Sequence, residues 1–390
     1  MSGTLATPRP SSRPARARAR RGALLAGMAV FFASALICVG RPSPLGFLVG
    51  DGPYYAETSV SLAFDHDLDL RNQLVGGLAV HGPQIALGPD GAWYPKHPIL
   101  LPLLGVPFVL LFGVRGLLLL NLLVVASVAA LVYALARRHA GPAASAAALL
   151  LLACGTFLHA YVYNLSPDLF AALLLLLGSR DLFERRPLRA GLWLGAAVFA
   201  KPLLVIVPPL ALLLAWSQGR GRCAARLAAG LLPAIAALCV FNWALFGSPL
   251  TTSYDRNVLL VAGRETVTSH RDQFDGNVLS GAAGQLFDRR HGLLPTAPVI
   301  LLAAPGLVIL FRRRRGEALY VTGVLTLLLA VLSPYRYWST SHVGHRFLIP
   351  ALVLFGAPLA LACEAAFAGL RRRAASRRLP RPLPATTAAP

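Results

Sequence analysis

The chain has 390 residues, of which 56% are hydrophobic and 14% charged, and its formal net charge is +21. This composition, with a mean hydropathy of +0.62, excludes an ordinary water-soluble domain and indicates an integral membrane protein. The positive charge does not require a nucleic-acid partner, because the arginines recur in short clusters at the ends of apolar runs, which is the positive-inside signature.

The apolar runs are close to the length that crosses a bilayer as a helix, and they lack the alternation of transmembrane β-strands. We therefore predict an all-α, polytopic membrane protein with about ten transmembrane helices and both termini in the cytoplasm. The predicted spans are 22–40, 116–136, 141–162, 168–180, 188–200, 202–217, 224–246, 292–311, 317–333 and 347–366.

This topology makes one transmembrane domain, 22–366, between two terminal segments of low complexity. Residues 1–21 form a basic arm and residues 367–390 a tail rich in Arg, Pro and Ala, and both are predicted to be disordered in the cytoplasm. Of the basic residues, 25 then lie inside and 12 outside, against 4 and 12 acidic residues. The whole net charge is therefore explained by topology.

Three polar segments are predicted on the outer side: a loop at 41–98, a second at 247–291 and a short one at 333–346. The segment 99–114 is apolar, but it is short and contains Pro102 and Pro107, and a crossing there would export the later arginine pairs. We interpret it as a juxtamembrane helix or a re-entrant segment on the outer side.

The first outer loop is rich in acids, although acids are scarce elsewhere in the chain. Asp51 and Glu57 follow the first span directly, and a carboxylate beside a membrane is costly to desolvate, so it calls for an explanation in function or solvation. The alternative is that Asp51, between Gly50 and Gly52, is a turn residue.

Asp65, Asp67 and Asp69 alternate farther along this loop. The pattern resembles the opening of a calcium-binding loop, but Leu70 and Gly76 stand where that motif needs Gly and Glu. A looser divalent site for Mg²⁺ or Mn²⁺ using one or two of these acids remains one interpretation. A solvated loop in which the acids cap turns and helices is the other.

Four basic or acidic side chains stand beside predicted helices. Lys96 and His97 follow an aromatic pair before the juxtamembrane helix, and Lys201 lies in an apolar hairpin where an ammonium must pair or reach the interface. Asp168 follows Ser166-Pro167, which is also an ordinary helix start with a serine cap.

The last outer segment carries four more candidates: Arg336, Tyr337, His345 and Arg346. Guanidinium groups suit the oxygens of a phosphate, so Arg336 and Arg346 together could clamp one. The alternative is a belt of aromatic and basic residues that anchors the interface.

Taken in order, these features resemble the GT-C superfamily of membrane glycosyltransferases, of the protein O-mannosyltransferase and aminoarabinose-transferase type (glycosyltransferase family 39). The elements are the acidic first loop, the His97-Pro98 step, the Asp168 helix start, the Lys201-Pro202 hairpin and the last aromatic-basic loop. The resemblance covers roughly 22–366, and it rests on their order and topology.

The resemblance implies an inverting transferase of the bacterial inner membrane with its active site on the outer face. Its donor is a polyprenyl-phosphate-linked sugar, and the acceptor is a lipid, a glycan or a protein. By this analogy Asp51 is the catalytic acid or base, because the hydroxyl that attacks in glycosyl transfer must lose a proton, and Asp168 is its helper. Relatives often carry a second acid after the first, where this chain has Gly52, which leaves open whether Glu57 takes that place. The candidate donor-binding side chains are Lys96, His97, Lys201, Arg336, Tyr337, His345 and Arg346.

Two other classes fit a polytopic chain with isolated charges. A transporter or flippase predicts charged residues near mid-membrane and repeated halves, whereas here the charges gather at one face and no clear repeat is found. A non-catalytic protein of envelope assembly would share the fold without the chemistry.

Overall fold

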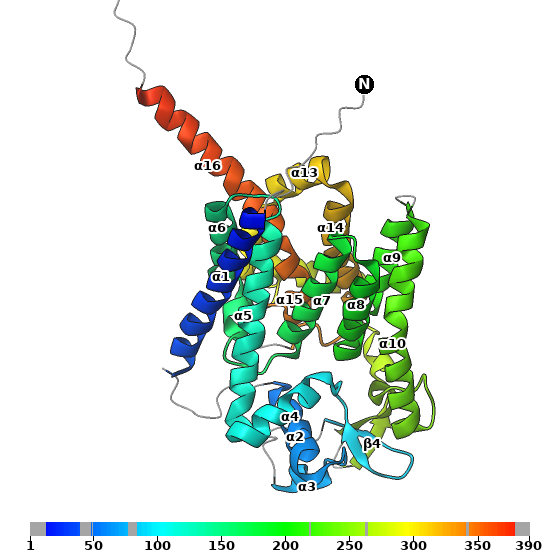
Figure 1. Ribbon diagram of the computed structural model, residues 1–390. Coiled ribbons are helices and arrows are strands. Elements are labelled where there is room, and N and C mark those ends of the chain that lie inside the picture. Colours follow the sequence, from blue (N-terminus) through cyan, green and yellow to red (C-terminus); the bar gives the residue numbers. More distant parts are fainter. Residues whose placement is uncertain are drawn as a thin grey trace, which may run out of the picture.

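The computed structural model describes residues 13–39, 48, 50–76, 84–217, 220–261, 264–340 and 343–378. It is a helical bundle with a small sheet at one end (Figure 1), and the all-α class is confirmed. The longer helices are α1 (Arg13–Val39), α5 (Gly116–Ala136), α6 (Pro142–Cys154), α7 (Pro167–Phe183), α8 (Pro187–Ala200), α9 (Val207–Ser217), α10 (Gly221–Phe246), α13 (Ala303–Arg313), α14 (Arg315–Leu332) and α16 (Gly356–Arg378).

Some helices match the predicted spans closely, whereas 141–162 is helical as α6 only to Cys154 and 292–311 is divided among three shorter helices. Among the described residues, five helical stretches are long and apolar enough to cross a membrane: 17–39, 100–136, 221–246, 315–332 and 346–373. Shorter apolar helices occupy 142–154, 187–200, 202–217 and 278–287. The chain is therefore an integral membrane protein, while the number of ten crossings stays a prediction.

The core is centred on α7, where most side chains are buried. It packs against α5, α8 and the short α15 (Ile349–Leu352). Helices α8 and α10 pack tightly, because Gly191 and Gly230 face each other's backbone and neither has room for a Cβ. Small residues at such positions let membrane helices approach closely.

The apolar segment after the first outer loop forms α4 (Leu100–Phe112). It ends where Gly113 adopts a positive φ of 61°, and the short η2 (Gly113–Arg115) joins it to α5. Figure 1 shows α4 beside α2 (Gly52–Val60) at the lower end of α5. The chain turns between α4 and α5, and the placement of 99–114 beside the membrane stays a prediction.

The first and second outer loops combine in a small antiparallel sheet within the described residues. Its strands are β1 (Ile85–Leu87), β2 (Trp93–Pro95), β3 (Asn257–Val261) and β4 (Arg264–Thr268), in the order β2-β1-β3-β4. Ala86 pairs with Asn257, and the Arg256 Nε donates to the Leu87 carbonyl at 3.0 Å. Strand pairing thus joins two loops that are far apart in the sequence.

Shorter elements complete the outer end. They are the π-helical turn η1 (Ser61–Asp65), α3 (Arg71–Gly76), η5 (Ser253–Arg256), η6 (His270–Gln273), α11 (Val278–Phe287), α12 (Leu293–Thr296) and η7 (Pro298–Leu302). Inside the bundle, η3 (Phe157–Tyr161) and η4 (Pro202–Ile206) follow α6 and α8, while η8 (Arg346–Leu348) and η9 (Val353–Phe355) flank α15.

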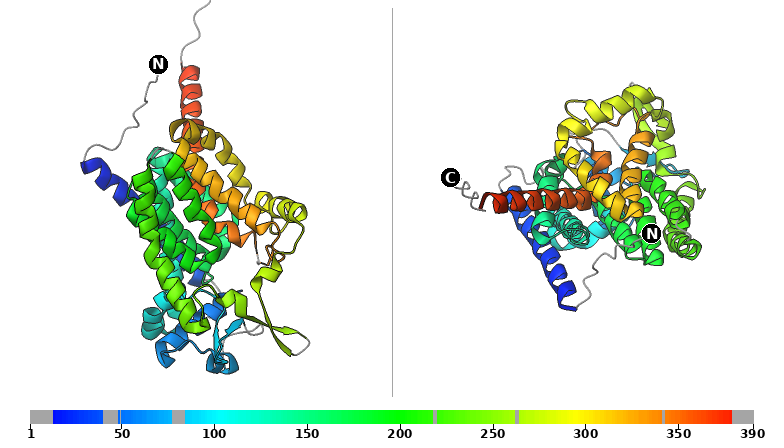
Figure 2. Two further views of the ribbon diagram at one scale, coloured as in Figure 1. Left: turned by 90° about the vertical axis from the view of Figure 1, so that its right-hand side faces the viewer. Right: turned by 90° about the horizontal axis from the view of Figure 1, so that it is seen from above.

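Both terminal segments are more helical than predicted. Helix α1 already begins at Arg13, and α16 continues to Arg378, past the end of the predicted span, so that its end projects beyond the bundle (Figure 2). The prediction of disorder for 13–21 and 367–378 is therefore wrong. Alanine and arginine dominate these segments and are strong helix formers. Each segment continues an apolar helix, so helix formation does not have to be nucleated again. The remaining terminal residues lie outside the described ranges.

Candidate active site

Asp51 lies immediately before α2 and is bound to a side chain from the other end of the sequence. Its carboxylate accepts a hydrogen bond from the Arg346 Nη1 at 2.8 Å, and both side chains are more than four-fifths buried. Asp51 occupies the N-cap position of α2, yet its side chain makes no capping bond within the described residues. The turn interpretation therefore explains the backbone position of Asp51. It does not explain the carboxylate, which forms the ion pair with Arg346.

The surroundings keep this carboxylate ionised. Burial alone would raise the pKa of Asp51, but the charge of Arg346, then His97, the hydrogen bond from Arg346 and the charge of Lys201 outweigh it, so the pKa lies below its usual range. At neutral pH Asp51 is a carboxylate held by a guanidinium. It can accept a proton or orient a hydroxyl once that guanidinium is engaged elsewhere.

Asp168 and Lys201 form a second ion pair beside the first. Asp168 stands in the first turn of α7 and is 2% exposed, and the ammonium of Lys201, between α8 and η4, bonds to its carboxylate. Ser166 caps α7 as predicted, its hydroxyl accepting from the Leu169 N–H at 3.2 Å. The sequence allowed the Lys201 ammonium either to pair with an acid or to reach the membrane interface. In the structure it pairs with Asp168 inside the protein.

The ring of Phe347 joins the two ion pairs. The Lys201 ammonium and the Arg346 guanidinium each lie 4.9 Å from its centroid. Cation–π attraction of this kind fixes both cations over one aromatic side chain. The predicted residues Asp51, Asp168, Lys201 and Arg346 are thereby one cluster, which we call the double ion pair.

Lys96 and His97 border the double ion pair. The His97 Nε2 lies 2.8 Å from the Gln84 Oε1, and its ring stacks on Tyr55 with centroids 5.1 Å apart. Burial lowers the pKa of His97 to about 4, despite the charge of Asp51, so the imidazole is neutral at pH 7. Burial also lowers the pKa of Lys96, partly offset by Asp51.

An aromatic wall from the segments 247–291 and 333–347 faces this cluster, and its members were not among the candidate site residues. His270 lies 5.0 Å from Tyr254 and 5.4 Å from Tyr335, and Tyr335 lies 5.7 Å from Phe347, all between ring centroids. Burial and the charge of Asp51 raise the pKa of Tyr254. Polar aromatic rings of this kind suit the faces and hydroxyls of a sugar. The only sequence signal was the position of these residues in two outer loops.

Four further predicted residues, besides Lys96 and His97, are not members of the double ion pair. Glu57 is buried in α2, where its charge adds to the effect of burial and raises the pKa of Tyr54. Arg336 is exposed and its Nε donates to Asp275 at 3.1 Å, and Tyr337 beside it is 39% exposed. The fourth is His345, which is fully buried, with its Nε2 2.9 Å from the Gln285 Oε1 and its ring 6.1 Å from that of Phe347.

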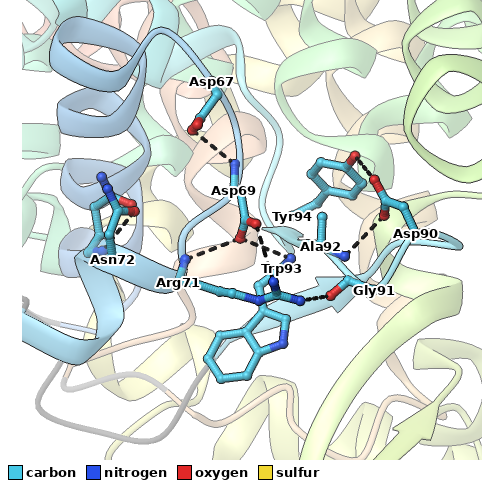
Figure 3. Close-up of polar contacts among 10 residues, drawn as sticks. Asp67, Asp69, Arg71, Asn72, Asp90, Gly91, Ala92, Trp93 and Tyr94 are labelled. Carbon is cyan, nitrogen blue, oxygen red and sulfur yellow. Dashed lines mark hydrogen bonds and ion pairs between the residues drawn. The ribbon is translucent and has the colours of Figure 1, made fainter.

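The three alternating acids accept hydrogen bonds from other residues of the chain, and Figure 3 shows those of Asp67 and Asp69. Asp67 accepts from the Asp69 N–H, and Asp69 accepts from the backbone N–H groups of Arg71 and Trp93. Asp65 accepts from two amide side chains of α3. Among the described residues, no group of three or more His, Cys, Asp or Glu side chains could hold a metal ion. The structure therefore shows the capping roles of these acids.

Comparison with known proteins identifies the architecture. The crystal structure of ArnT from Cupriavidus metallidurans bound to undecaprenyl phosphate superposes with a TM-score of 0.54 at 19% identity, over 90% of this chain and 63% of that one. Its apo structure gives a TM-score of 0.50 at 17% identity, over 86% and 59%. The chain thus spans less than two thirds of ArnT.

Neither a protein-family model nor a curated protein matches the sequence. The structural likeness nevertheless covers nearly the whole bundle, and at 19% identity it shows that the chain shares the fold of ArnT. The GT-C-like fold that the order of motifs predicted is therefore confirmed.

Proposed function

We propose that the chain is a membrane glycosyltransferase that moves a sugar from a polyprenyl-phosphate-linked donor to an acceptor at the outer face of the bacterial inner membrane. The observation that carries the proposal is the double ion pair, built from three loops and a helix start at the end of a GT-C-like bundle. The ArnT neighbour binds undecaprenyl phosphate, which supports a lipid phosphate as the group recognised here.

The charges of the site favour an anionic ligand. Lys96, Lys201 and Arg346 are three basic groups around two carboxylates, Asp51 and Asp168. A guanidinium and an ammonium over one ring are suited to the oxygens of a phosphate. We infer that the donor phosphate binds Arg346 and Lys201 and competes with the two carboxylates for them.

This competition gives Asp51 its role. In the ion pair Asp51 is a weak base, because Arg346 stabilises its charged form. Once the phosphate engages Arg346, the pKa of Asp51 rises and the carboxylate can accept the proton of the acceptor hydroxyl. The hydroxyl oxygen then bonds to the anomeric carbon as the bond from that carbon to the donor phosphate breaks, and the polyprenyl phosphate leaves with the electron pair.

The test is sugar transfer from a panel of radiolabelled polyprenyl-phosphate donors in membranes that contain the wild type or one of three variants. Asp51→Asn is expected to lower donor consumption by at least about a hundredfold, and Asp168→Asn to lower it less. Asp275→Asn is the matched control, since it removes an exposed outer carboxylate outside the cluster, and it should turn over like the wild type. Wild-type turnover by Asp51→Asn, or no consumption by well-expressed wild type, would favour a transporter or assembly protein.

A further inference from the structure

A separate cavity of about 300 Å³ lies at the arginine-rich end of the bundle, which is the upper end in Figure 1. It is bordered by the ends of α7, α9 and α13 and by the starts of α8, α10 and α14. The double ion pair and the sheet lie at the other end. This cavity therefore plays no part in the proposed transfer reaction.

The cavity is strongly basic. Five arginines line it: Arg185, Arg220, Arg313, Arg314 and Arg315. Its one acidic lining residue is Glu317, whose carboxylate lies 3.2 Å from the Arg138 Nη2 and 3.0 Å from the His139 Nε2. The negative charge of Glu317 is thus already shared with two basic groups, and the cavity keeps a large positive excess.

The backbone around the cavity adds to this positive potential. In the described chain, α8, α10 and α14 all begin at its wall, and none of the three has a side-chain hydrogen bond capping its start. A helix start carries partial positive charge and free N–H groups, and it normally attracts an acid or an anion. Here the N-cap residues of α10 and α14 are Arg220 and Arg314. Glu317 is an acid in the first turn of α14, whereas α8 and α10 have no acid there, so an anion at the starts of α8 and α10 would be favourable.

Arg185 shows a further departure from the usual pattern. It adopts a φ of 60°, in the left-handed region that glycine usually fills after a helix. A side chain held at such a position in a cavity is a sign of a functional constraint. The positive-inside rule explains why arginines lie at this end of the protein, but not why they surround one cavity.

The other walls of the cavity indicate the kind of anion. They are apolar, with Leu182, Leu214 and Ala215 among them. On the adjoining surface of α9, Leu213 and Trp216 are 64% and 70% exposed, and tryptophan is typical of the membrane interface. A basic cavity between membrane helices with an apolar wall is suited to a lipid headgroup and the glycerol attached to it.

We propose that this cavity binds the phosphate headgroup of an anionic phospholipid from the leaflet on the arginine-rich side. The guanidinium groups and the helix starts hold the phosphate oxygens, and the apolar wall contacts the glycerol and the upper acyl chains. The bound lipid would tie together the ends of six helices.

The test is native mass spectrometry of the full-length protein in detergent, titrated with short-chain phosphatidylglycerol or phosphatidylcholine. The wild type should bind one phosphatidylglycerol in preference to phosphatidylcholine. Arg185→Gly with Arg220→Gln should weaken this binding about 25-fold, because each interfacial arginine contributes about fivefold. Glycine suits the backbone at residue 185, so the variant should fold at least as well as the wild type.

Arg222→Gln with Arg226→Gln is the matched control. Both residues are exposed on the first turns of α10 and do not line the cavity, so the charge removed is the same and binding should change less than about twofold. Equal loss in both variants, or equal binding of the two lipids, would mean that the arginines act only as interfacial charge. Displacement of phosphatidylglycerol by inorganic phosphate at equal concentration would identify the ligand as a soluble phosphate and overturn the lipid proposal.

Discussion

The Asp51–Arg346 ion pair can be tested by a double-mutant cycle. At 2.8 Å the Coulomb attraction is about 6 kcal/mol for an effective dielectric constant of about 20, and most of this offsets the desolvation of the two groups. Removing one partner leaves a buried charge without its counter-ion, which costs roughly 3 kcal/mol. We therefore expect Asp51→Asn and Arg346→Gln each to lower the free energy of unfolding by about that amount.

The double variant should lose about 2 kcal/mol less than the sum of the two single losses. The assay is reversible chemical denaturation of the four purified proteins in detergent at pH 7. The pKa of Asp51 is lowered in the fold, so the pair stabilises the protein above the unfolded pKa of about 4 and its contribution is lost as pH falls below that value. Single losses that add to within about 0.5 kcal/mol at pH 7 would refute the reasoning.

Three further predictions concern side chains around the site and in the bundle. Because the pKa of His97 falls from 6.5 to about 4 in the fold, the wild type should lose up to about 3 kcal/mol as pH falls from 6.5 to 4. In His97→Gln the midpoint of thermal unfolding should change less between pH 6.5 and pH 4 than in the wild type, and an equal change in both proteins would contradict this. Phe347→Leu removes both cation–π contacts and should cost about 1–2 kcal/mol in chemical denaturation, whereas Phe274→Leu should have the smaller effect. Gly230→Leu should collide with the α8 backbone and destabilise the bundle by about 3 kcal/mol or more, while Gly369→Leu, with open space around it, should melt like the wild type.

The helices could be read from the sequence because hydrophobic length and arginine placement are local signals. The predicted span 116–136 coincides with α5, and 188–200 differs from α8 by one residue at its start. The sheet could not be predicted in the same way. Strands β1 and β2 are three residues long, and β3 pairs with β1 across about 170 residues of sequence, so neither strand has a periodic pattern that reveals its partner.

The candidate site was predictable as a set of residues but not as a set of contacts. Asp51, Lys201 and Arg346 stood out because charged side chains are costly beside a membrane. The choice of partners depends on the tertiary fold, which pairs Asp51 with Arg346 and Lys201 with Asp168. The arginines that line the cavity at the other end of the bundle carried no such signal, since the positive-inside rule already accounted for each of them separately.

The distances in sequence also bear on what holds the site together. Asp51 and Arg346 are separated by 295 residues, and the sheet that joins the two outer loops borders them. None of these contacts forms until the helices between them have packed, since closing such long loops costs entropy that local contacts do not repay. A change that loosens α8 against α10 should therefore separate Lys201 from Asp168 before it unfolds any helix. Activity is expected to be lost at a lower denaturant concentration than helicity, because the site depends on how the helices pack.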